Sequence, residues 1–196
     1  MLADIKKYVY RGEYMSVKSI TSPLSGKVIS ELKAGERILL SGTFYTARDA
    51  AHKRMADSVE RGEGFPFNIK GQTIYYVGPT PAQPGHIIGS AGPTTSGRMD
   101  KYTPTLLNSG LKTIIGKGYL GEEVVESIKK NKAVYLAAIG GLGALISRSI
   151  KHMEVIAYED LGPEAIYKLT VEDFPAIVIV DCFGDNWYEI GRDAFN

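Results

Sequence analysis

The sequence predicts one α/β domain built on a mixed sheet with βαβ units. From residue 99 onward, short apolar runs alternate with helical patterns, which is typical of parallel strands joined by crossover helices. The first half is richer in strand-like segments, and the chain closes on an apolar run at 177–180, so we expect additional β structure. With 196 residues and 44% hydrophobic side chains, one domain over 1–196 has enough material for a substantial core.

In the first half we expect a polar lead-in, two strands and one long helix. Residues 1–14 form the lead-in. The apolar run at 36–42 ends in glycine, which favours a strand closed by a glycine turn. Thr46 is a suitable N-cap for a helix over 47–61, because small and apolar residues recur there at helical spacing. The β-branched and aromatic run at 73–77 predicts the next strand.

A proline-rich loop at 78–85 leads into the alternating half of the chain. The expected helices there are 99–108, 122–130 and 142–151, and the expected strands are 111–115, 133–139 and 154–158. Strands separated by helices in this way predict a parallel sheet.

The charge pattern excludes some partners. Net charge is +1 and basic residues are interspersed with acidic ones, so no footprint for nucleic acid or an anionic membrane is expected. No apolar run approaches the roughly 20 residues of a membrane span, and the N-terminus lacks the apolar core of a signal peptide. We therefore expect a cytoplasmic protein.

The single cysteine, Cys182, cannot form an internal disulfide or hold an iron-sulfur cluster by itself. It follows an apolar run and precedes a turn, which favours a small residue at a strand end over a nucleophile. His52, His86 and His152 are far apart and show no metal-ligand spacing, so we expect no metal site in this chain.

Two glycine motifs resemble nucleotide-binding loops and are rejected. The segment 140–144 follows a strand, but Ile146 stands where a dinucleotide-binding turn has its third glycine. The segment 116–118 resembles the end of a P-loop, but Leu111 replaces the first glycine of that motif and Gly118 replaces its hydroxyl residue.

The segment 90–100 combines glycine, proline, adjacent hydroxyls and an arginine between an apolar run and a helical pattern. Its glycines allow backbone N–H groups to point inward, Thr94 and Thr95 are able to cap the following helix, and Arg98 lies one turn beyond Thr94. The same pattern serves an oxyanion site or a purely structural helix cap, and the sequence leaves both open.

Three cations follow predicted strand ends: Arg48, Arg98 and Lys117. Ligand contacts collect at such positions in α/β sheets, and three cations with a hydroxyl cluster suit a small dicarboxylate. A solvated lysine is the alternative for Lys117. Composition and spacing propose an anion site and no reaction.

Three blocks of sequence resemble a known family. They are TARDAAHKR at 46–54, AGPTTSGRMD at 91–100 and IGKG at 115–118. In these blocks the chain resembles the β subunit, or the equivalent C-terminal domain, of the iron-sulfur-dependent class I fumarate hydratases and the related L(+)-tartrate dehydratases. The resemblance covers nearly everything after the lead-in.

This resemblance implies a swivelling β/β/α domain that pairs with a larger α subunit, in a heterotetramer of two α and two β subunits. The α subunit would carry a 4Fe-4S cluster on three cysteines, the cluster iron would act as a Lewis acid, and the dicarboxylate would bind between the subunits. By similarity, Arg48, Arg98 and Lys117 hold the substrate carboxylates, and Thr95 and Ser96 line the same loop.

The resemblance also assigns the proton transfer. Thr94 corresponds to the proposed base at C3, and His52 matches a histidine treated as catalytic in parts of the family. A histidine that only orients a neighbour is the alternative for His52. No carboxylate of this chain is clearly placed as the acid that releases water, so we expect that acid on the partner.

The loop ending in Met99 and Asp100, followed by Tyr102, is more similar to the fumarase version than to the tartrate version. The resemblance therefore favours reversible hydration of fumarate to L-malate. The alternatives are the β subunit of an L(+)-tartrate dehydratase, which converts tartrate to oxaloacetate, and a non-catalytic subunit that binds a dicarboxylate.

Overall fold

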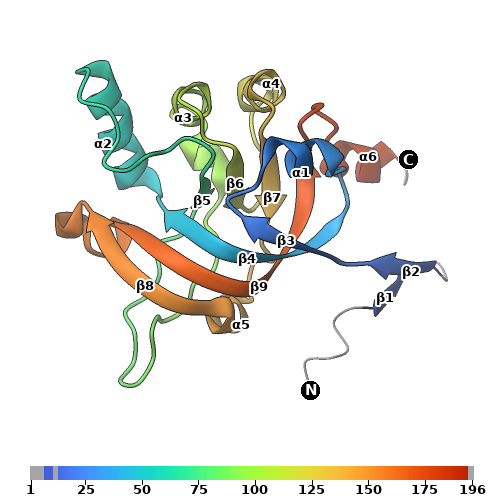
Figure 1. Cartoon of the computed structure of the whole chain (residues 1–196), viewed down its shortest axis with the longest axis horizontal. Helices are drawn as coiled ribbons and strands as arrows, with labels where there is room; N and C mark the ends of the chain where they lie inside the picture. The colour runs from blue at the N-terminus through green and yellow to red at the C-terminus, as the bar shows by residue number, and fades with distance from the viewer. Residues whose placement is uncertain (1–6, 11–12, 194–196) are drawn as a thin grey trace.

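The structure, a computed structural model, describes residues 7–10 and 13–193, with side chains from residue 17 onward. Strands β1 (Lys7–Tyr10) and β2 (Glu13–Ser16) form a small antiparallel pair beside the main sheet (Figure 1). Part of the predicted lead-in therefore forms strands, and the rest lies outside the described residues.

The main sheet of the described chain has seven strands, and helices cover part of it. The strands are β3 (Lys18–Ser22), β4 (Arg37–Thr46), β5 (Thr73–Tyr75), β6 (Thr113–Gly116), β7 (Val134–Ala137), β8 (Ile150–Ala157) and β9 (Ile166–Val180). The helices are α1 (Gly26–Glu31), α2 (Asp49–Glu60), α3 (Thr103–Asn108), α4 (Glu122–Asn131), α5 (Gly143–Ile146) and α6 (Trp187–Asp193), with 3₁₀ turns η1 (Ser96–Met99), η2 (Ser147–Ser149) and η3 (Glu159–Glu164). The predicted α/β class with a mixed sheet is confirmed.

Five of these strands close on themselves. Strands β4, β5, β6 and β7 run parallel to one another, and β9 pairs antiparallel with both β7 and β4. This closes a barrel-like ring, to which β3 adds along β4 and β8 along β9. Closure leaves none of the five ring strands as a sheet edge, and the outer edges of the described sheet are β3 and β8.

Two apolar cores lie on opposite faces of the parallel strands. On β5, Tyr75 points into the ring and packs edge-on against Phe174 of β9, with ring centroids 5.2 Å apart. Its neighbours Ile74 and Tyr76 belong to the second core, under α2, α3 and α4, which lie in a row in Figure 1. Because both faces are buried, the strands are continuous apolar runs rather than alternating ones.

The predicted turn at Gly42 is wrong, because β4 continues through it to Thr46. Gly42 adopts a φ of 115°, and the pairing with β9 shifts register between Leu40 and Gly42. A Cβ at Gly42 would lie 2.1 Å from the Ser22 carbonyl oxygen. The glycine therefore permits a bulge and the close approach of β3, and it does not end the strand.

The predicted N-cap at Thr46 is also wrong. Thr46 is buried in β4, where its hydroxyl donates to the Ala165 carbonyl at 3.3 Å and accepts from the Tyr167 N–H at 3.0 Å. Helix α2 begins at Asp49, after Arg48 in the N-cap position. The hydroxyl that suggested a cap instead joins β4 to the start of β9.

Two predicted helices are shorter than expected. The helix expected at 99–108 is divided into η1 and α3, because Pro104 in the first turn of α3 has no N–H to continue the preceding turn. The helix expected at 142–151 ends at Ile146, followed by the 3₁₀ turn η2. The chain extends from Ile150 because that buried residue pairs with β9.

The central part of the prediction is confirmed: α4, β5, β6 and β7 lie where the sequence places them, within a few residues. Strand β3, helix α1, helix α6 and most of the length of β9 were not predicted.

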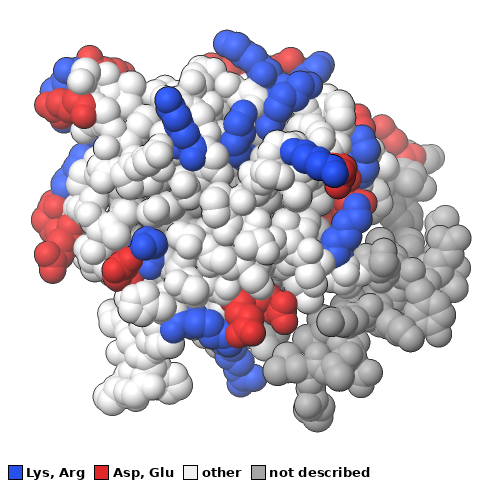
Figure 2. Space-filling view, in the orientation of Figure 1, with Lys and Arg blue, Asp and Glu red and all other residues white. Residues whose placement is uncertain are grey.

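Figure 2 shows that the middle of the face in Figure 1, over β4 and β9, carries few charged side chains. None of the helices in the described residues has the length and apolarity needed to cross a membrane.

Candidate functional site

The predicted site residues lie where the parallel strands end. Arg48 follows β4, and Lys117 follows β6. The loop between β5 and η1 is fastened across these ends, because the Thr94 N–H donates to the Tyr76 carbonyl at 2.8 Å and the Ser96 N–H donates to the Lys117 carbonyl at 2.9 Å. Residue 95 forms a parallel bridge with Lys117. The fold therefore brings the hydroxyl loop and the lysine together.

Ser96 fastens this loop with its buried hydroxyl. The hydroxyl oxygen accepts from the Lys117 N–H at 3.1 Å, and its proton goes to the Tyr135 oxygen at 3.0 Å, since the Tyr135 hydroxyl donates to the Gly118 carbonyl at 2.9 Å. A Cβ at Gly116 would lie 2.0 Å from the Ser96 oxygen. Ser96 thus holds the turn that carries Lys117, and its predicted contact with substrate stays a prediction.

Unlike Ser96, Thr94 and Thr95 do not use their hydroxyls to hold the loop in place. Thr94 is half-buried and Thr95 is exposed, and neither hydroxyl has a hydrogen-bond partner among the described residues. Thr95 occupies the N-cap position of η1 without a side-chain capping bond, so the expected helix cap is wrong for this residue. This leaves both hydroxyls available to a ligand.

Arg48 lies at the start of α2 with its side chain across Gly78. A Cβ at Gly78 would be 2.7 Å from the Arg48 Cδ, so the glycine makes room for the arginine. The Arg48 Nε is 3.4 Å from Glu164 Oε1, and Glu164 Oε2 accepts from the Ala50 N–H at 2.9 Å. Glu164, from the distant turn η3, therefore caps α2 and holds Arg48.

Asp49 connects the two arginines. Its Oδ1 accepts from the Arg98 Nε at 2.9 Å, and its Oδ2 accepts from the Arg48 Nε at 3.3 Å. Burial raises the pKa of the Asp49 carboxyl, but its own backbone N–H and the charges of Arg98 and Arg48 outweigh this, and the pKa is lowered overall. Asp49 is therefore ionised at neutral pH, and two arginines far apart in sequence share one carboxylate.

The terminal nitrogens of the three site cations make no hydrogen bond to the described residues. Among the described residues, no hydrogen bond engages the terminal nitrogens Nη1 and Nη2 of Arg48 or Arg98, or the Nζ of Lys117, and the ion pairs of the two arginines with Asp49 and Glu164 are closest at Nε. The Arg48 side chain is 25% exposed and that of Arg98 is 50% exposed. A guanidinium with both terminal nitrogens available matches a carboxylate in a bidentate manner, so the arrangement suits a carboxylate ligand.

His52 lies beneath Arg48 and is fully buried. Its Nδ1–H donates to the Arg48 carbonyl at 3.0 Å, and its ring meets the Tyr76 ring edge-on with centroids 4.8 Å apart. Burial lowers the pKa of His52 to about 4, so the ring is neutral at pH 7. Its Nε2 is a buried lone pair without a partner among the described residues. The structure places His52 behind the site and not on its surface.

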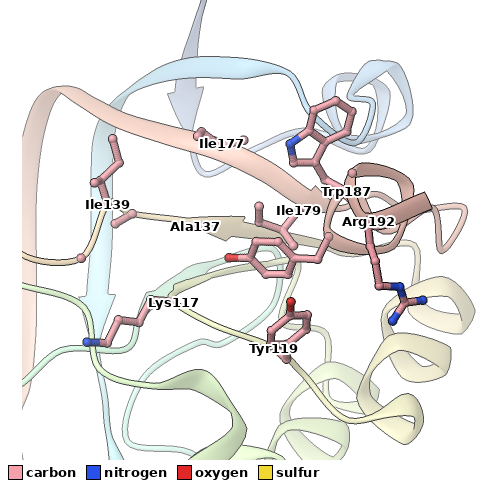
Figure 3. A pocket seen from close by; sticks show the side chains of 12 residues that line it. Lys117, Tyr119, Ala137, Ile139, Ile177, Ile179, Trp187 and Arg192 are labelled. Atoms are coloured by element: carbon pink, nitrogen blue, oxygen red, sulfur yellow. The ribbon is translucent and has the colours of Figure 1, made fainter. Parts of the chain in front are cut away.

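A largely apolar hollow of about 560 Å³ adjoins Lys117. Figure 3 shows Lys117 and Tyr119 on one side of it, and Ile177 of β9 and Trp187 of α6 on the other. Several apolar side chains there are exposed, with Tyr119 at 71%, Ile139 at 48% and Trp187 at 40%. Ile139 and Ile177 also line a second apolar hollow, of about 200 Å³, beside β4. Apolar surface therefore continues outward from the cationic edge.

Sequence reasoning missed three residues of the site: Asp49, Glu164 and Gly78. Asp49 had a readable signal, since an acidic residue beside Arg48 in the first turn of a predicted helix is a ready ion-pair partner. Glu164 and Gly78 had none, because they meet Arg48 only through the closure of the sheet.

The described residues offer no ligand set for an iron-sulfur cluster. Cys182 is buried just beyond β9, and burial raises the pKa of its thiol, which disfavours the thiolate that metals bind. No group of three or more histidine, cysteine, aspartate or glutamate side chains in the described part of the chain is arranged to hold a metal ion. An iron-sulfur cluster does not fit the described residues.

Comparison with known proteins identifies a family and relatives that match most of this chain. Residues 7–191 match the family described as Fumarase C-terminus. The chain is 41% identical over 163 residues to "Fumarate hydratase class I, aerobic" of Salmonella typhimurium (strain LT2), covering 82% of this chain and 28% of the relative. The corresponding Escherichia coli (strain K12) protein is 40% identical over 163 residues, covering 82% of this chain and 30% of the relative.

A shorter relative matches along most of its length. "Putative L(+)-tartrate dehydratase subunit beta" of Methanocaldococcus jannaschii is 35% identical over 172 residues, covering 85% of this chain and 88% of that protein. The chain thus spans less than a third of the two fumarate hydratases but most of the tartrate dehydratase subunit. The family resemblance inferred from the sequence blocks is confirmed.

Proposed function

Since this chain belongs to the Fumarase C-terminus family, we propose that it is the β-subunit component of a class I hydro-lyase that interconverts fumarate and L-malate. The observation that carries the proposal is that the terminal nitrogens of Arg48 and Arg98 and the Nζ of Lys117 make no hydrogen bond to the described residues, at strand ends crossed by the loop that carries Thr94. A C4 dicarboxylate presents two carboxylates, and three cations match that charge distribution.

In the proposed reaction, dehydration of malate removes a proton from C3 and the hydroxyl from C2. Arg48, Arg98 and Lys117 bind the carboxylates and stabilise the charge that develops as the C3 proton leaves. Thr94 takes this proton. A free threonine hydroxyl is almost fully protonated at neutral pH, so the neighbouring cations must lower its pKa. His52 is the rival base or relay, with its unpartnered Nε2 as the acceptor.

The remaining chemistry falls to a partner. We place the 4Fe-4S cluster and the acid at the C2 hydroxyl on an α subunit, in a heterotetramer of two α and two β subunits in the cytoplasm. The apolar hollow lined by Ile139 and Trp187 is the proposed partner-facing surface, because it is exposed and adjoins Lys117. We further propose that the chain acts as a swivelling domain that closes the substrate between the two subunits.

L(+)-tartrate is the second candidate substrate. The observation that favours it is the relative in Methanocaldococcus jannaschii, whose printed name is a tartrate dehydratase subunit and whose length this chain nearly spans. Tartrate differs from malate by one further hydroxyl, so the same carboxylate-binding cations serve either acid. A non-catalytic subunit that only binds a dicarboxylate is the remaining alternative.

The test is anaerobic turnover of malate, and separately of tartrate, by this chain mixed with a reconstituted cluster-bearing α subunit, with each subunit alone as a control. Activity in the mixture alone supports the split site and names the substrate. A stable complex with an intact cluster and no turnover of either acid would contradict the hydro-lyase and favour the binding subunit.

The base is tested by exchange of the C3 proton of malate with deuterated solvent. Thr94→Val keeps the shape of the side chain and removes the hydroxyl, so we expect exchange to be abolished. Thr95→Val is the matched control at the neighbouring free hydroxyl. Exchange that persists in Thr94→Val and stops in His52→Asn would transfer the role to His52.

A further inference from the structure

Asp49 holds both site arginines in the same way. It accepts from the Nε of Arg98 and from the Nε of Arg48, at 2.9 and 3.3 Å. The Nε is the guanidinium nitrogen nearest the backbone. A carboxylate that accepts from Nε leaves the two terminal nitrogens, Nη1 and Nη2, which we call the fork, open to another acceptor. Glu164 approaches the Arg48 Nε as well, at 3.4 Å.

We propose that Asp49 is a positioning residue of the carboxylate site: it fixes Arg48 and Arg98 through Nε so that the forks of both present their terminal nitrogens to one dicarboxylate. This inference rests on the proposed function. Asp49 is suited to the task because it lies in the first turn of α2, directly after Arg48, and carries two oxygens that point to different arginines.

Two other roles for Asp49 make different predictions. An acidic residue at a helix N-terminus also stabilises the helix, which would affect melting but not substrate binding. A carboxylate beside two arginines can also compete with the substrate for them, in which case its removal would strengthen binding. Positioning requires that removal weakens binding, since unfixed side chains must be ordered by the ligand.

The first measurement is NMR of the arginine Nε–H groups in the whole chain, which needs no activity. Asp49→Asn keeps the size of the side chain but leaves one acceptor for two donors. We expect slower exchange of the Arg48 and Arg98 Nε–H protons in the wild type than in Asp49→Asn. Asp160→Asn is the matched control, because Asp160 pairs with Arg54 of the same helix and makes no hydrogen bond to Arg48 or Arg98. Equal exchange in wild type and Asp49→Asn would overturn the proposal.

The second measurement is kinetic, in the complex with the α subunit. We expect Asp49→Asn to raise KM by about tenfold or more, the size expected when a charge-assisted hydrogen bond is lost, with a smaller change in kcat. Asp160→Asn is expected to match the wild type. An unchanged or lower KM in Asp49→Asn would overturn the positioning role, even if its melting temperature falls.

Succinate, a dicarboxylate that cannot be dehydrated, separates this inference from the proposed function. If the wild-type complex turns over neither malate nor tartrate, the proposed function fails. Titration of succinate into the complex still tests the inference, and we expect about tenfold weaker binding to Asp49→Asn than to wild type. Equal succinate binding by the two proteins would overturn it.

Discussion

Arg48, the N-cap residue of α2, and Arg54, within the helix, bind aspartates in opposite ways. Arg54 donates through both Nη1 and Nη2 to Asp160, each at 2.7 Å, so its fork is closed by a bidentate pair. Arg48 and its neighbour Arg98 meet Asp49 through Nε, at 3.3 and 2.9 Å, so their forks stay open. The same residue types therefore form an ion pair that uses both terminal nitrogens at one place and an ion pair through Nε, with no hydrogen bond at the terminal nitrogens, at another.

The difference lies in the direction of approach: Asp160 meets the terminal nitrogens of Arg54, whereas Asp49 meets the Nε of Arg48 and of Arg98. A closed fork has no remaining planar pair of donors for a ligand carboxylate. An arginine held by Nε is fixed in place and keeps that pair. The comparison predicts that, of these three arginines, Arg48 and Arg98 bind substrate and Arg54 does not.

The largest expected effect comes from removing an open fork. Arg98→Ala should lower kcat/KM in the complex by on the order of 100-fold or more, because each charge-assisted hydrogen bond contributes roughly 1.5–3 kcal/mol. Arg98→Lys, which keeps the charge and loses the fork, should recover only part of this. Folding should be intact, since Arg98 is half exposed. Turnover kinetics measure the loss of kcat/KM, and thermal melts measure whether folding is intact.

Arg54→Ala is the control for the closed fork. It should leave turnover unchanged, because Asp160 already occupies both terminal nitrogens of Arg54. Near-normal turnover in Arg98→Ala, or an equal loss in both variants, would break the comparison.

The second effect concerns stability and pH. His52 lies on α2 between the two arginines, and burial lowers its pKa to about 4 from an ordinary value of 6.5. The unfolded chain therefore binds the proton first, and stability falls as pH drops from 6.5 to 4. The difference is roughly 3 kcal/mol for one fully buried histidine. Urea unfolding at several pH values in this window should show the loss.

His52→Asn should flatten this pH dependence, because it removes the group that titrates. Any loss of packing in the variant lowers stability at all pH values and does not affect the slope. His152→Asn, on the exposed face of β8, is the control and should follow the wild-type curve. A slope in His52→Asn equal to that of the wild type would show that another group controls the acid range.

Local signals in the sequence predicted the central parallel strands and α4, where apolar runs and helical spacing agree with the tertiary packing. They failed at Gly42 and Thr46, whose roles are set by β3 and β9, segments distant in sequence. A glycine that permits a bulge has the same local pattern as a glycine that ends a strand. Long-range pairing decided between them.

In the candidate site, too, local features were predictable from the sequence and long-range contacts were not. The sequence indicated the cations Arg48, Arg98 and Lys117, because their residue types and positions after strands are local properties. It did not indicate that Asp49 joins two of them, or that the Ser96 hydroxyl is enclosed by hydrogen bonds. Those facts depend on how the loop crosses the strand ends.

The smallest expected effect comes from moving an open fork without removing it. A Cβ at Gly78 would lie 2.7 Å from the Arg48 Cδ and 3.2 Å from the Pro163 carbonyl oxygen, so Gly78→Ala must displace the flexible arginine. We expect KM to rise roughly threefold to tenfold, with little change in melting temperature. This effect is smaller than that of Arg98→Ala, because the charge-assisted hydrogen bonds are displaced and not removed. Gly26→Ala, where a Cβ meets nothing within 4 Å, is the matched control. An unchanged KM in Gly78→Ala would mean that the position of the Arg48 side chain across Gly78 is not the one used in binding, and the open fork of Arg98 alone would then carry the comparison.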